Sequence, residues 1–382
     1  MDKNANYPFR TPAYVVDEQR LTDNLKILRN IALEADCKIL LAQKAFSMYS
    51  LYPLISDFLS GTCSSGVYEA QLSSDKMPGR ENHIYSAAYN PDDFAHIVKI
   101  CDHIVFNNFK QFSQFYPQIR RSGKSRKIGI RINPEYSEVK TEIYNPCSPM
   151  SRLGCRIEDF PEALPDQISG FHFHTMCEQG ADVLERTLKH VINKFGHLMV
   201  YPQITWLNFG GGHSITQPGY DIKKLIDIIK RTKKEFNTEI YLEPGEAVAQ
   251  NAGILVSRVL DIVNTKSGKC AILDVSPACH MPDVLEMPYR PPVLGGFEPN
   301  VKPHTYILAG PTCLAGDICG TYSFAEPLAP GTEVVFCDMA IYTMVKNNSF
   351  NGMKLPSIYT KNTSGDYSVI KRFAYRDFMS RL

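Results

Sequence analysis

Eight short runs of apolar and β-branched residues follow one another between Lys38 and Glu243, and they constrain the fold more than any other feature. Helical patterns separate several of them, for example at 181–195 and 221–236. Strands that alternate with helices are typical of a parallel sheet, and eight repeats favour a closed (β/α)₈ barrel over an open sheet. The predicted strands cover 38–44, a short run ending at Gly66, 83–89, 102–106, 127–133, 168–174, 205–209 and 239–243.

The pattern changes after about residue 255. Helical periodicity fades, and short strands bounded by Pro and Gly replace it, which indicates a second, mainly antiparallel β domain. These strands lie at 271–275, 305–309, 332–337 and 366–370, and the isolated run 11–16 is expected to join them. We therefore predict an α/β protein with a barrel at 20–255 and a β domain made of 1–19 and 256–382.

Composition excludes several classes of protein. With 44% hydrophobic residues, 21% charged residues and a net charge of +1, the chain predicts a globular protein that binds neither nucleic acid nor an anionic membrane. No apolar run approaches the roughly 20 residues that span a bilayer, and no signal peptide is visible. The eleven cysteines are scattered without zinc-site spacing, so we expect no metal and a cytoplasmic protein with reduced thiols.

Reactive side chains stand at the ends of the predicted barrel strands. Lys44 ends the first run and Glu243 ends the last, and in a parallel barrel all C-terminal strand ends meet at one mouth. These two residues are therefore expected to be neighbours. An amine that can form an imine, facing a carboxylate that can keep a pyridine nitrogen protonated, is what pyridoxal-phosphate chemistry requires. Taken alone, a lysine such as Lys44 is more often a surface residue, and Glu243 could equally be a structural glutamate that accepts hydrogen bonds from backbone N–H groups.

Two further strand ends carry groups that suit a phosphorylated aromatic ligand. A glycine triplet, Gly210 to Gly212, follows the seventh strand, and the loops after strands seven and eight commonly bind phosphate in barrels. His172 and His174 alternate with phenylalanines and so share one face of the sixth strand. An imidazole there could stack on a planar ring, and Thr175 could offer its hydroxyl to a phosphate. Metal binding by the two histidines lacks a third ligand.

The second domain also contains candidate reactive groups. The loop 310–317 is constrained by Gly and Pro and contains Cys313 and Asp317, so a thiol and a carboxylate could be presented to a neighbouring site. Tyr342 follows a predicted strand and could reach a phosphate or a substrate. The long segment 134–150 has three prolines and no periodicity, and we expect a loop that covers the barrel mouth.

Together these motifs resemble the fold-type III pyridoxal-phosphate decarboxylases, which join an alanine racemase-like barrel to a β domain. Within this family the chain is most similar to the carboxynorspermidine/carboxyspermidine decarboxylases. The resemblance extends from residue 11 to residue 352. It is carried by Leu-Ala-Gln-Lys44-Ala-Phe, His172-Phe-His-Thr175, Gly210-Gly-Gly-His213, Glu243-Pro-Gly-Glu246, Gly-Pro-Thr-Cys313 and Asp338-Met-Ala-Ile-Tyr342.

The resemblance implies a decarboxylase that uses pyridoxal 5′-phosphate. Lys44 would bind the cofactor as an imine, His172 would stack on its ring, and Glu243 would pair with its pyridine nitrogen. The phosphate would be bound by Thr175, Gly210, Gly211, Gly212 and Tyr342. Cys313 would reach into the site of a second subunit and help to protonate the decarboxylated carbon, so a homodimer with composite active sites is expected.

Departures from the family pattern bear on the substrate. Glu246 stands where an arginine is common, so any phosphate contact of that arginine must be absent. Leu314 replaces the acid that follows the cysteine in diaminopimelate and ornithine enzymes. Glu286 stands where diaminopimelate enzymes place an arginine, and a carboxylate would attract an ammonium group instead. Asp283 and Glu286, together with Asp317, are thus predicted to bind a polyamine-like substrate, carboxynorspermidine or carboxyspermidine.

Four alternatives remain open at this stage. One is a decarboxylase of diaminopimelate or ornithine, and another is an amino-acid racemase on the same fold, which would need a second base. A third is a homologue that holds the cofactor without catalysis. The fourth is a barrel glycosidase that uses Glu178 and Glu243, although it would leave Lys44 and the glycine triplet unexplained.

Overall fold

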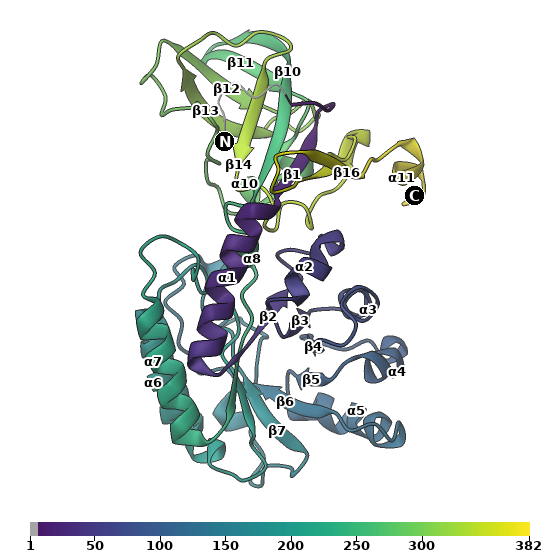
Figure 1. Ribbon diagram of the computed structural model, residues 1–382, viewed down its shortest axis with the longest axis vertical. Coiled ribbons are helices and arrows are strands. Elements are labelled where there is room, and N and C mark those ends of the chain that lie inside the picture. The colour runs from purple at the N-terminus through teal and green to yellow at the C-terminus, as the bar shows by residue number, and fades with distance from the viewer. Residues whose placement is uncertain (1–6) are drawn as a thin grey trace. The chain divides into compact units, whose positions relative to one another are not determined.

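The computed structural model describes residues 7–382 (Figure 1). The chain divides into two compact units. One comprises residues 24–248 and is called the barrel unit below. The other comprises the residues up to 23 together with 249–382 and is called the sheet unit. Within residues 7–382, no helix combines the length and the apolar character needed to cross a bilayer.

The barrel unit contains a closed barrel of eight parallel strands, which confirms the predicted fold class. Neighbouring strands follow chain order, and β2 pairs with β9 to close the barrel. The strands are β2 (Lys38–Ala42), β3 (Gly61–Ser64), β4 (Glu81–Tyr85), β5 (His103–Phe106), β6 (Lys127–Arg131), β7 (Ile168–His172), β8 (Trp206–Asn208) and β9 (Glu239–Leu242).

Helices lie outside these strands, as Figure 1 shows. They are α1 (Glu18–Ala35), α2 (Tyr52–Ser56), α3 (Val67–Lys76), α4 (Pro91–Ile100), α5 (Phe109–Arg121), α6 (Ala181–Met199), α7 (Ile222–Phe236) and α8 (Glu246–Ala249), with 3₁₀ turns η1 (Tyr49–Leu51), η2 (Glu142–Tyr144) and η3 (Ile157–Asp159). Asn90, Asn108 and Asp221 cap α4, α5 and α7 by accepting hydrogen bonds from backbone N–H groups of the first turn. Only η2 and η3 lie between β6 and β7, so the predicted long loop is present there.

Trp206 fills the barrel interior and explains two glycines in neighbouring strands. Its side chain is fully buried. A Cβ atom at Gly129 would lie 2.4 Å from its ring, and one at Gly170 would lie 2.1 Å from it. The indole therefore occupies the space that side chains on β6 and β7 would need, and close packing of this kind leaves no room for substitution.

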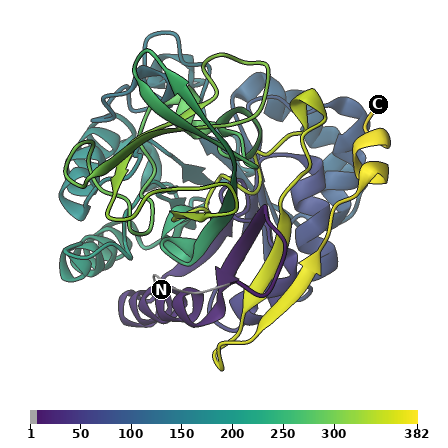
Figure 2. The same ribbon diagram turned by 90° about the horizontal axis from the view of Figure 1, so that it is seen from above.

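The sheet unit is a mixed, mostly antiparallel sheet, as predicted. The strand order is β13-β12-β11-β10-β1-β15-β16, with β14 paired to β10. Figure 2 shows β1 beside β15, and β15 pairs in turn with β16, so the isolated N-terminal strand does join this sheet. The elements are β1 (Ala13–Asp17), β10 (Gly253–Thr265), β11 (Gly268–Leu273), β12 (His304–Ala309), β13 (Ile318–Phe324), β14 (Glu333–Cys337), β15 (Ser357–Lys361), β16 (Tyr367–Lys371), α9 (Pro277–His280), α10 (Asp283–Glu286), α11 (Tyr375–Met379) and η4 (Phe350–Gly352).

Candidate active site

The C-terminal ends of β7, β8 and β9 bring three polar side chains into contact. Oε2 of Glu243 lies 3.2 Å from Nε2 of His172, and Nδ2 of Asn208 donates to Oε1 of Glu243 at 2.7 Å. His172 and Asn208 are paired in register across β7 and β8. The parallel strands therefore gather an imidazole, an amide and a carboxylate at one mouth, as expected from barrel geometry.

Glu243 is an anion at neutral pH. Burial acts to raise its pKa, but the contact with His172 and the hydrogen bond from Asn208 outweigh burial and hold the pKa at about 2. Burial lowers the pKa of His172, so its imidazole is expected to be neutral at pH 7. The site therefore presents a carboxylate that could pair with a cationic ring nitrogen.

Lys44 lies two positions beyond the end of β2, in a turn that reaches the same mouth. The backbone N–H of Ala42 donates to the carbonyl of Pro244 at 3.0 Å, which ties this strand end to the loop that contains Glu243. Lys44 is exposed, whereas its neighbours Gln43 and Ala45 are buried. Its charge contributes to the lowered pKa of His174, which places the amine within electrostatic range of β7. The structure thus presents an accessible amine at the same end of the barrel as the carboxylate.

The glycine triplet is wedged between the loops that follow β7 and β9. A Cβ atom at Gly211 would lie 2.3 Å from the carbonyl oxygen of Glu243, and one at Gly212 would lie 2.0 Å from that of Met176. The N–H of Gly210 donates to Asn208 Oδ1, and the N–H of Gly211 donates to His174 Nδ1. These two amides already donate to groups of the protein, so the N–H of Gly212 is the main candidate of the triplet for binding a phosphate. Phosphate binding by the triplet stays a prediction.

Substitution of Gly212 tests this packing. Gly212→Ala should lower the free energy of unfolding, because the residue has a φ of 84° and its added Cβ would clash with Met176. Gly219→Ala is a matched control, since Gly219 has a φ of 86° but nothing lies near its Cβ position. In urea denaturation we expect a loss of about 1–2 kcal/mol for the control and about 1–3 kcal/mol more for Gly212→Ala. Equal losses would contradict the tight fit.

Two buried polar atoms at the barrel mouth could form hydrogen bonds with a ligand. Among the described residues, no group forms a hydrogen bond with Thr175 Oγ1 or His172 Nδ1, although both side chains are buried. Buried polar atoms without partners are uncommon and often mark a place where a ligand binds. Among the described residues, the Thr175 hydroxyl and the Nδ1 atom of His172 are therefore available to a ligand, whereas Nε2 of His172 faces Glu243.

Two residues that shape this mouth lie outside the motifs that predicted the site. Arg131, at the end of β6, is buried; its Nη2 donates to the His174 carbonyl at 3.0 Å, and its guanidinium lies 4.5 Å from the centre of the Tyr85 ring. Asn208 orients Glu243, as described above. Each is a polar residue inside an otherwise apolar predicted strand, and that pattern could have identified both.

The remaining predicted residues belong to the sheet unit. Cys313 is exposed, and its backbone N–H donates to Asn351 Oδ1 at 3.0 Å. Tyr342 has a left-handed backbone with a φ of 52°. Asp283 and Glu286 both lie in α10 and form ion pairs with Lys346. The roles predicted for these four residues, in proton transfer, phosphate binding and substrate binding, remain proposals.

Asp317 requires a correction. Its sequence context predicts a substrate contact, but the residue is only 2% exposed. Its Oδ1 accepts hydrogen bonds from Ser276 Oγ and the Ala278 N–H, and its Oδ2 accepts one from Thr312 Oγ1. Both carboxylate oxygens are therefore used inside the protein. Asp317 holds the loop that carries Cys313 against α9 and is not included in the proposed substrate site.

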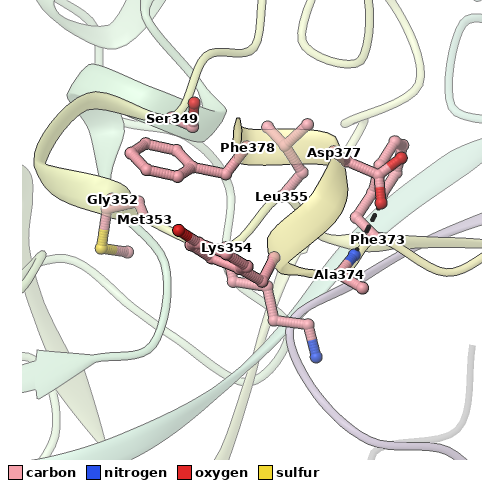
Figure 3. A pocket seen from close by; sticks show the side chains of 10 residues that line it. Ser349, Gly352, Met353, Lys354, Leu355, Phe373, Ala374, Asp377 and Phe378 are labelled. Atoms are coloured by element: carbon pink, nitrogen blue, oxygen red, sulfur yellow. Dashed lines mark hydrogen bonds between the residues drawn. The ribbon is translucent and has the colours of Figure 1, made fainter. Parts of the chain in front are cut away.

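A cavity near the C-terminus contains none of the predicted site residues. It lies between the segment around η4 and helix α11 (Figure 3). Its lining is largely apolar and includes Met353, Leu355, Phe373 and Phe378. Ser349, Lys354 and Asp377 also line it, and none of them is a residue predicted for the cofactor or substrate site.

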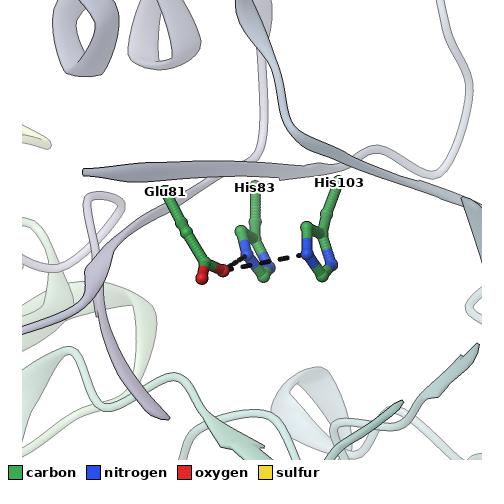
Figure 4. A group of neighbouring side chains, drawn as sticks. All are labelled: Glu81, His83 and His103. Carbon is green, nitrogen blue, oxygen red and sulfur yellow. Dashed lines mark hydrogen bonds and ion pairs between the residues drawn. The ribbon is translucent and has the colours of Figure 1, made fainter. Parts of the chain in front are cut away.

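A second polar cluster lies at the opposite end of the barrel, where β4 and β5 begin (Figure 4). Glu81 Oε2 lies 2.8 Å from His83 Nε2 and 3.7 Å from His103 Nε2, and Lys38 donates to the other Glu81 oxygen. The two imidazoles stack face to face, with centres 3.7 Å apart and planes inclined by 12°. A metal ion bound by two imidazoles lies near the plane of each ring, and stacked rings do not allow this. The arrangement instead fits a hydrogen-bonded polar core.

Comparison with known proteins identifies close relatives. The family model for the C-terminal sheet domain of pyridoxal-dependent decarboxylases matches residues 13–340. A carboxynorspermidine/carboxyspermidine decarboxylase from Campylobacter jejuni is 39% identical, and the match covers 97% of this chain and 98% of the relative. A carboxyaminopropylagmatine decarboxylase from Synechocystis sp. is also 39% identical, with 97% and 95% covered.

Solved structures agree with these matches. The crystal structure of a carboxynorspermidine decarboxylase from Campylobacter jejuni, complexed with norspermidine, has a TM-score of 0.91 and 37% identity and covers 98% of this chain and 100% of its own. A diaminopimelate decarboxylase from M. jannaschii in complex with L-lysine has a TM-score of 0.78 at 17% identity, covers 98% of this chain and 92% of its own, and shares the fold.

Proposed function

The chain belongs to the pyridoxal-dependent decarboxylases, and from that premise we propose that it removes CO₂ from a carboxylated polyamine, carboxynorspermidine or carboxyspermidine. The observation that carries this choice of substrate is the acid pair of α10. Asp283 and Glu286 already bind one ammonium group, that of Lys346, and a polyamine tail offers the same group. The near full-length relatives with matching substrates support the choice.

The residues at the barrel mouth fit pyridoxal 5′-phosphate. The bound cofactor supplies an electron sink for the electron pair left on Cα when CO₂ departs. Lys44 would hold the cofactor covalently, and the anionic Glu243 would keep a proton on its pyridine nitrogen. His172 would pack against the ring. The hydroxyl of Thr175, which has no hydrogen-bond partner among residues 7–382, would bind the phosphate, together with Gly212 and Tyr342.

Cys313 is the proposed proton donor to Cα after CO₂ leaves. Its thiol is exposed on a loop held by Asp317 and Asn351, so it is available to a reacting group outside its own fold unit. A thiol at this place would give its proton to carbon and recover one from solvent. The proton thus moves without any change in the oxidation state of the sulfur.

Cys313→Ala should slow turnover by roughly tenfold or more, on the scale expected for losing a proton donor, while the visible absorbance of the bound cofactor stays intact. Cys337→Ala, a partly buried cysteine of the same unit, is the matched control and should turn over normally. Steady-state rates and absorbance spectra of the two variants provide the comparison. Unchanged turnover in Cys313→Ala would remove the thiol from the mechanism.

We also propose a cytoplasmic homodimer whose subunits share composite sites. Exposed apolar residues of the sheet unit, including Phe350, Tyr375 and Met379, support an interface between copies of the chain. Light scattering gives the oligomeric state. If each site combines Lys44 from one subunit with Cys313 from the other, mixing the Lys44→Ala and Cys313→Ala proteins should restore part of the activity that each lacks.

The proposed function is tested by assaying the purified protein, with pyridoxal phosphate, for release of CO₂. The panel comprises carboxynorspermidine, carboxyspermidine, carboxyaminopropylagmatine, diaminopimelate and ornithine. We expect release from the first two. Release only from diaminopimelate or ornithine would overturn the substrate, and inversion of an amino acid without CO₂ would indicate a racemase.

Carboxyaminopropylagmatine is the second candidate substrate, because one near full-length relative acts on it. Its tail ends in a planar guanidinium, which can bind two carboxylates at once. The same acid pair could therefore accept it. A higher kcat/KM for this compound than for the two carboxylated polyamines would favour this alternative.

A further inference from the structure

Lys346 bridges the two acids that the proposed function assigns to the substrate tail. Its Nζ lies 2.5 Å from Asp283 Oδ1 and also binds Glu286 Oε2. Burial acts to lower the pKa of Lys346, but its two carboxylate partners outweigh burial and raise it, so the amine stays charged at neutral pH. The three side chains form a cluster, the α10 charge cluster, in which two anions face one cation.

The segment that carries Lys346 is fixed to α9, the helix that precedes α10. The N–H of Asn348 donates to the carbonyl of Cys279 at 2.8 Å, and its Nδ2 donates to the carbonyl of Ala278 at 2.8 Å. The N–H of Lys346 donates to the carbonyl of Tyr342 at 2.9 Å. These bonds fix the backbone around Lys346 next to α9. The lysine is therefore held close to the two acids, and the ion pairs do not depend on its flexible side chain alone.

The cluster remains accessible to an incoming amine. The side chains of Asp283, Glu286 and Lys346 are 22%, 47% and 31% exposed. Lys346 contacts one oxygen of each carboxylate, and a carboxylate can accept hydrogen bonds from more than one donor. A substrate ammonium could therefore bind beside Lys346.

We propose that Lys346 sets the charge that the substrate-tail site recognises. With two carboxylates and one ammonium, the α10 charge cluster has a net charge of −1, which matches a single positive group of the tail. This inference rests on the proposed function, since it assigns the cluster to the tail. Lys346 would therefore determine which substrate tails bind, and it takes no part in the bond-breaking step.

Removing Lys346 should change which amines bind best. The cluster would then have a net charge of −2 and would favour tails with two positive groups over tails with one. One added unit charge at about 6 Å, at an effective dielectric constant of about 40 that lies between the values for a protein surface and for water, corresponds to roughly a tenfold change in this preference. Salt should weaken the change, because partly exposed charges are screened.

The experiment measures binding of simple amines to the holoenzyme. Inhibition constants or calorimetric Kd values are determined for 1,3-diaminopropane and norspermidine, which differ in their number of amino groups. For Lys346→Met we expect the ratio of the two constants to shift about tenfold toward the more highly charged amine. Lys346→Arg should keep the wild-type ratio. Lys371→Met, which removes the lysine of an exposed ion pair with Asp377 in the same unit, is the matched control.

A double variant separates the effect of the cluster's charge from any disturbance of the fold that the loss of Lys346 causes. Asp283→Asn combined with Lys346→Met returns the cluster to a net charge of −1 and should restore the wild-type ratio. A ratio that is unchanged in Lys346→Met, or equally shifted in the double variant, would overturn the proposal. Calorimetry needs no turnover, so a failure to decarboxylate polyamines would count against the proposed function without deciding the role of Lys346.

Discussion

Lys44→Ala is expected to abolish turnover and to remove the visible absorbance of the bound cofactor. Lys44 is the exposed amine at the mouth that contains Glu243, and covalent attachment of the cofactor requires an amine at that place. Loss of a covalently bonding residue typically reduces kcat by more than about 10³-fold. Absorbance spectra of the protein reconstituted with pyridoxal phosphate, together with CO₂ release, measure both effects.

Two control variants separate chemistry from charge. Lys44→Arg keeps the positive charge but offers no amine for the covalent bond, so it should lose the absorbance as Lys44→Ala does. Lys127→Ala alters a partly exposed lysine at the start of β6, at the other end of the barrel, and should retain the band and the activity. An undiminished band in Lys44→Ala would refute the assigned role of this residue.

Glu243→Gln is expected to lower kcat by about 10²-fold or more while the cofactor stays bound. Glutamine keeps the shape and can still accept the hydrogen bond from Asn208, but it has no negative charge to hold a proton on the pyridine nitrogen. Removing one aligned electrostatic contact in a reacting site costs 10²–10³ in rate for comparable cases. Glu246→Gln, in the same motif, is the control and should retain most of the activity. A wild-type kcat in Glu243→Gln would contradict the pairing.

The pH dependence of stability gives an independent check on Glu243. Its pKa of about 2 in the folded protein lies below the ordinary value of 4.5. A carboxyl whose pKa is lowered by folding stabilises the folded state above the ordinary pKa, and this contribution is lost as the pH falls toward 2. Urea denaturation between pH 6 and pH 3 should therefore show a smaller loss of stability for Glu243→Gln than for the wild type. Parallel curves would argue against a lowered pKa.

The barrel could be predicted because local sequence patterns determine it. The apolar runs are short and separated by helical periodicity, which favours a parallel sheet covered by helices on both faces, and eight repeats favour closing that sheet into a barrel. The predicted strands extend slightly too far: β2 ends at Ala42 and β7 at His172, so Lys44 lies in a turn and His174 in an irregular segment beyond the strand ends. Strand boundaries depend on hydrogen bonds to neighbouring strands, which a local pattern does not contain.

The interior environment of the site could not be predicted in the same way. Asp317 looked like a ligand-binding acid but is buried under three donors that come from two separate segments of the chain. The amides of Gly210 and Gly211 looked available to a phosphate but donate to Asn208 and His174. In each case at least one partner lies far away in the chain: Ser276 and Ala278 for Asp317, and His174 for Gly211. A local motif does not show that such a partner will occupy the hydrogen-bonding group.

The sequence by itself determined the order of the strands, the types of reactive group at their ends and the resemblance to a decarboxylase family, because these depend on residues close together in the chain. Only the tertiary structure decided which groups are paired, buried or accessible. It set the ionisation of Glu243 through Asn208 and His172, and it placed Lys346 between Asp283 and Glu286. Charge and hydrogen bonding act through space, over a few ångströms, between residues that can be far apart in the chain.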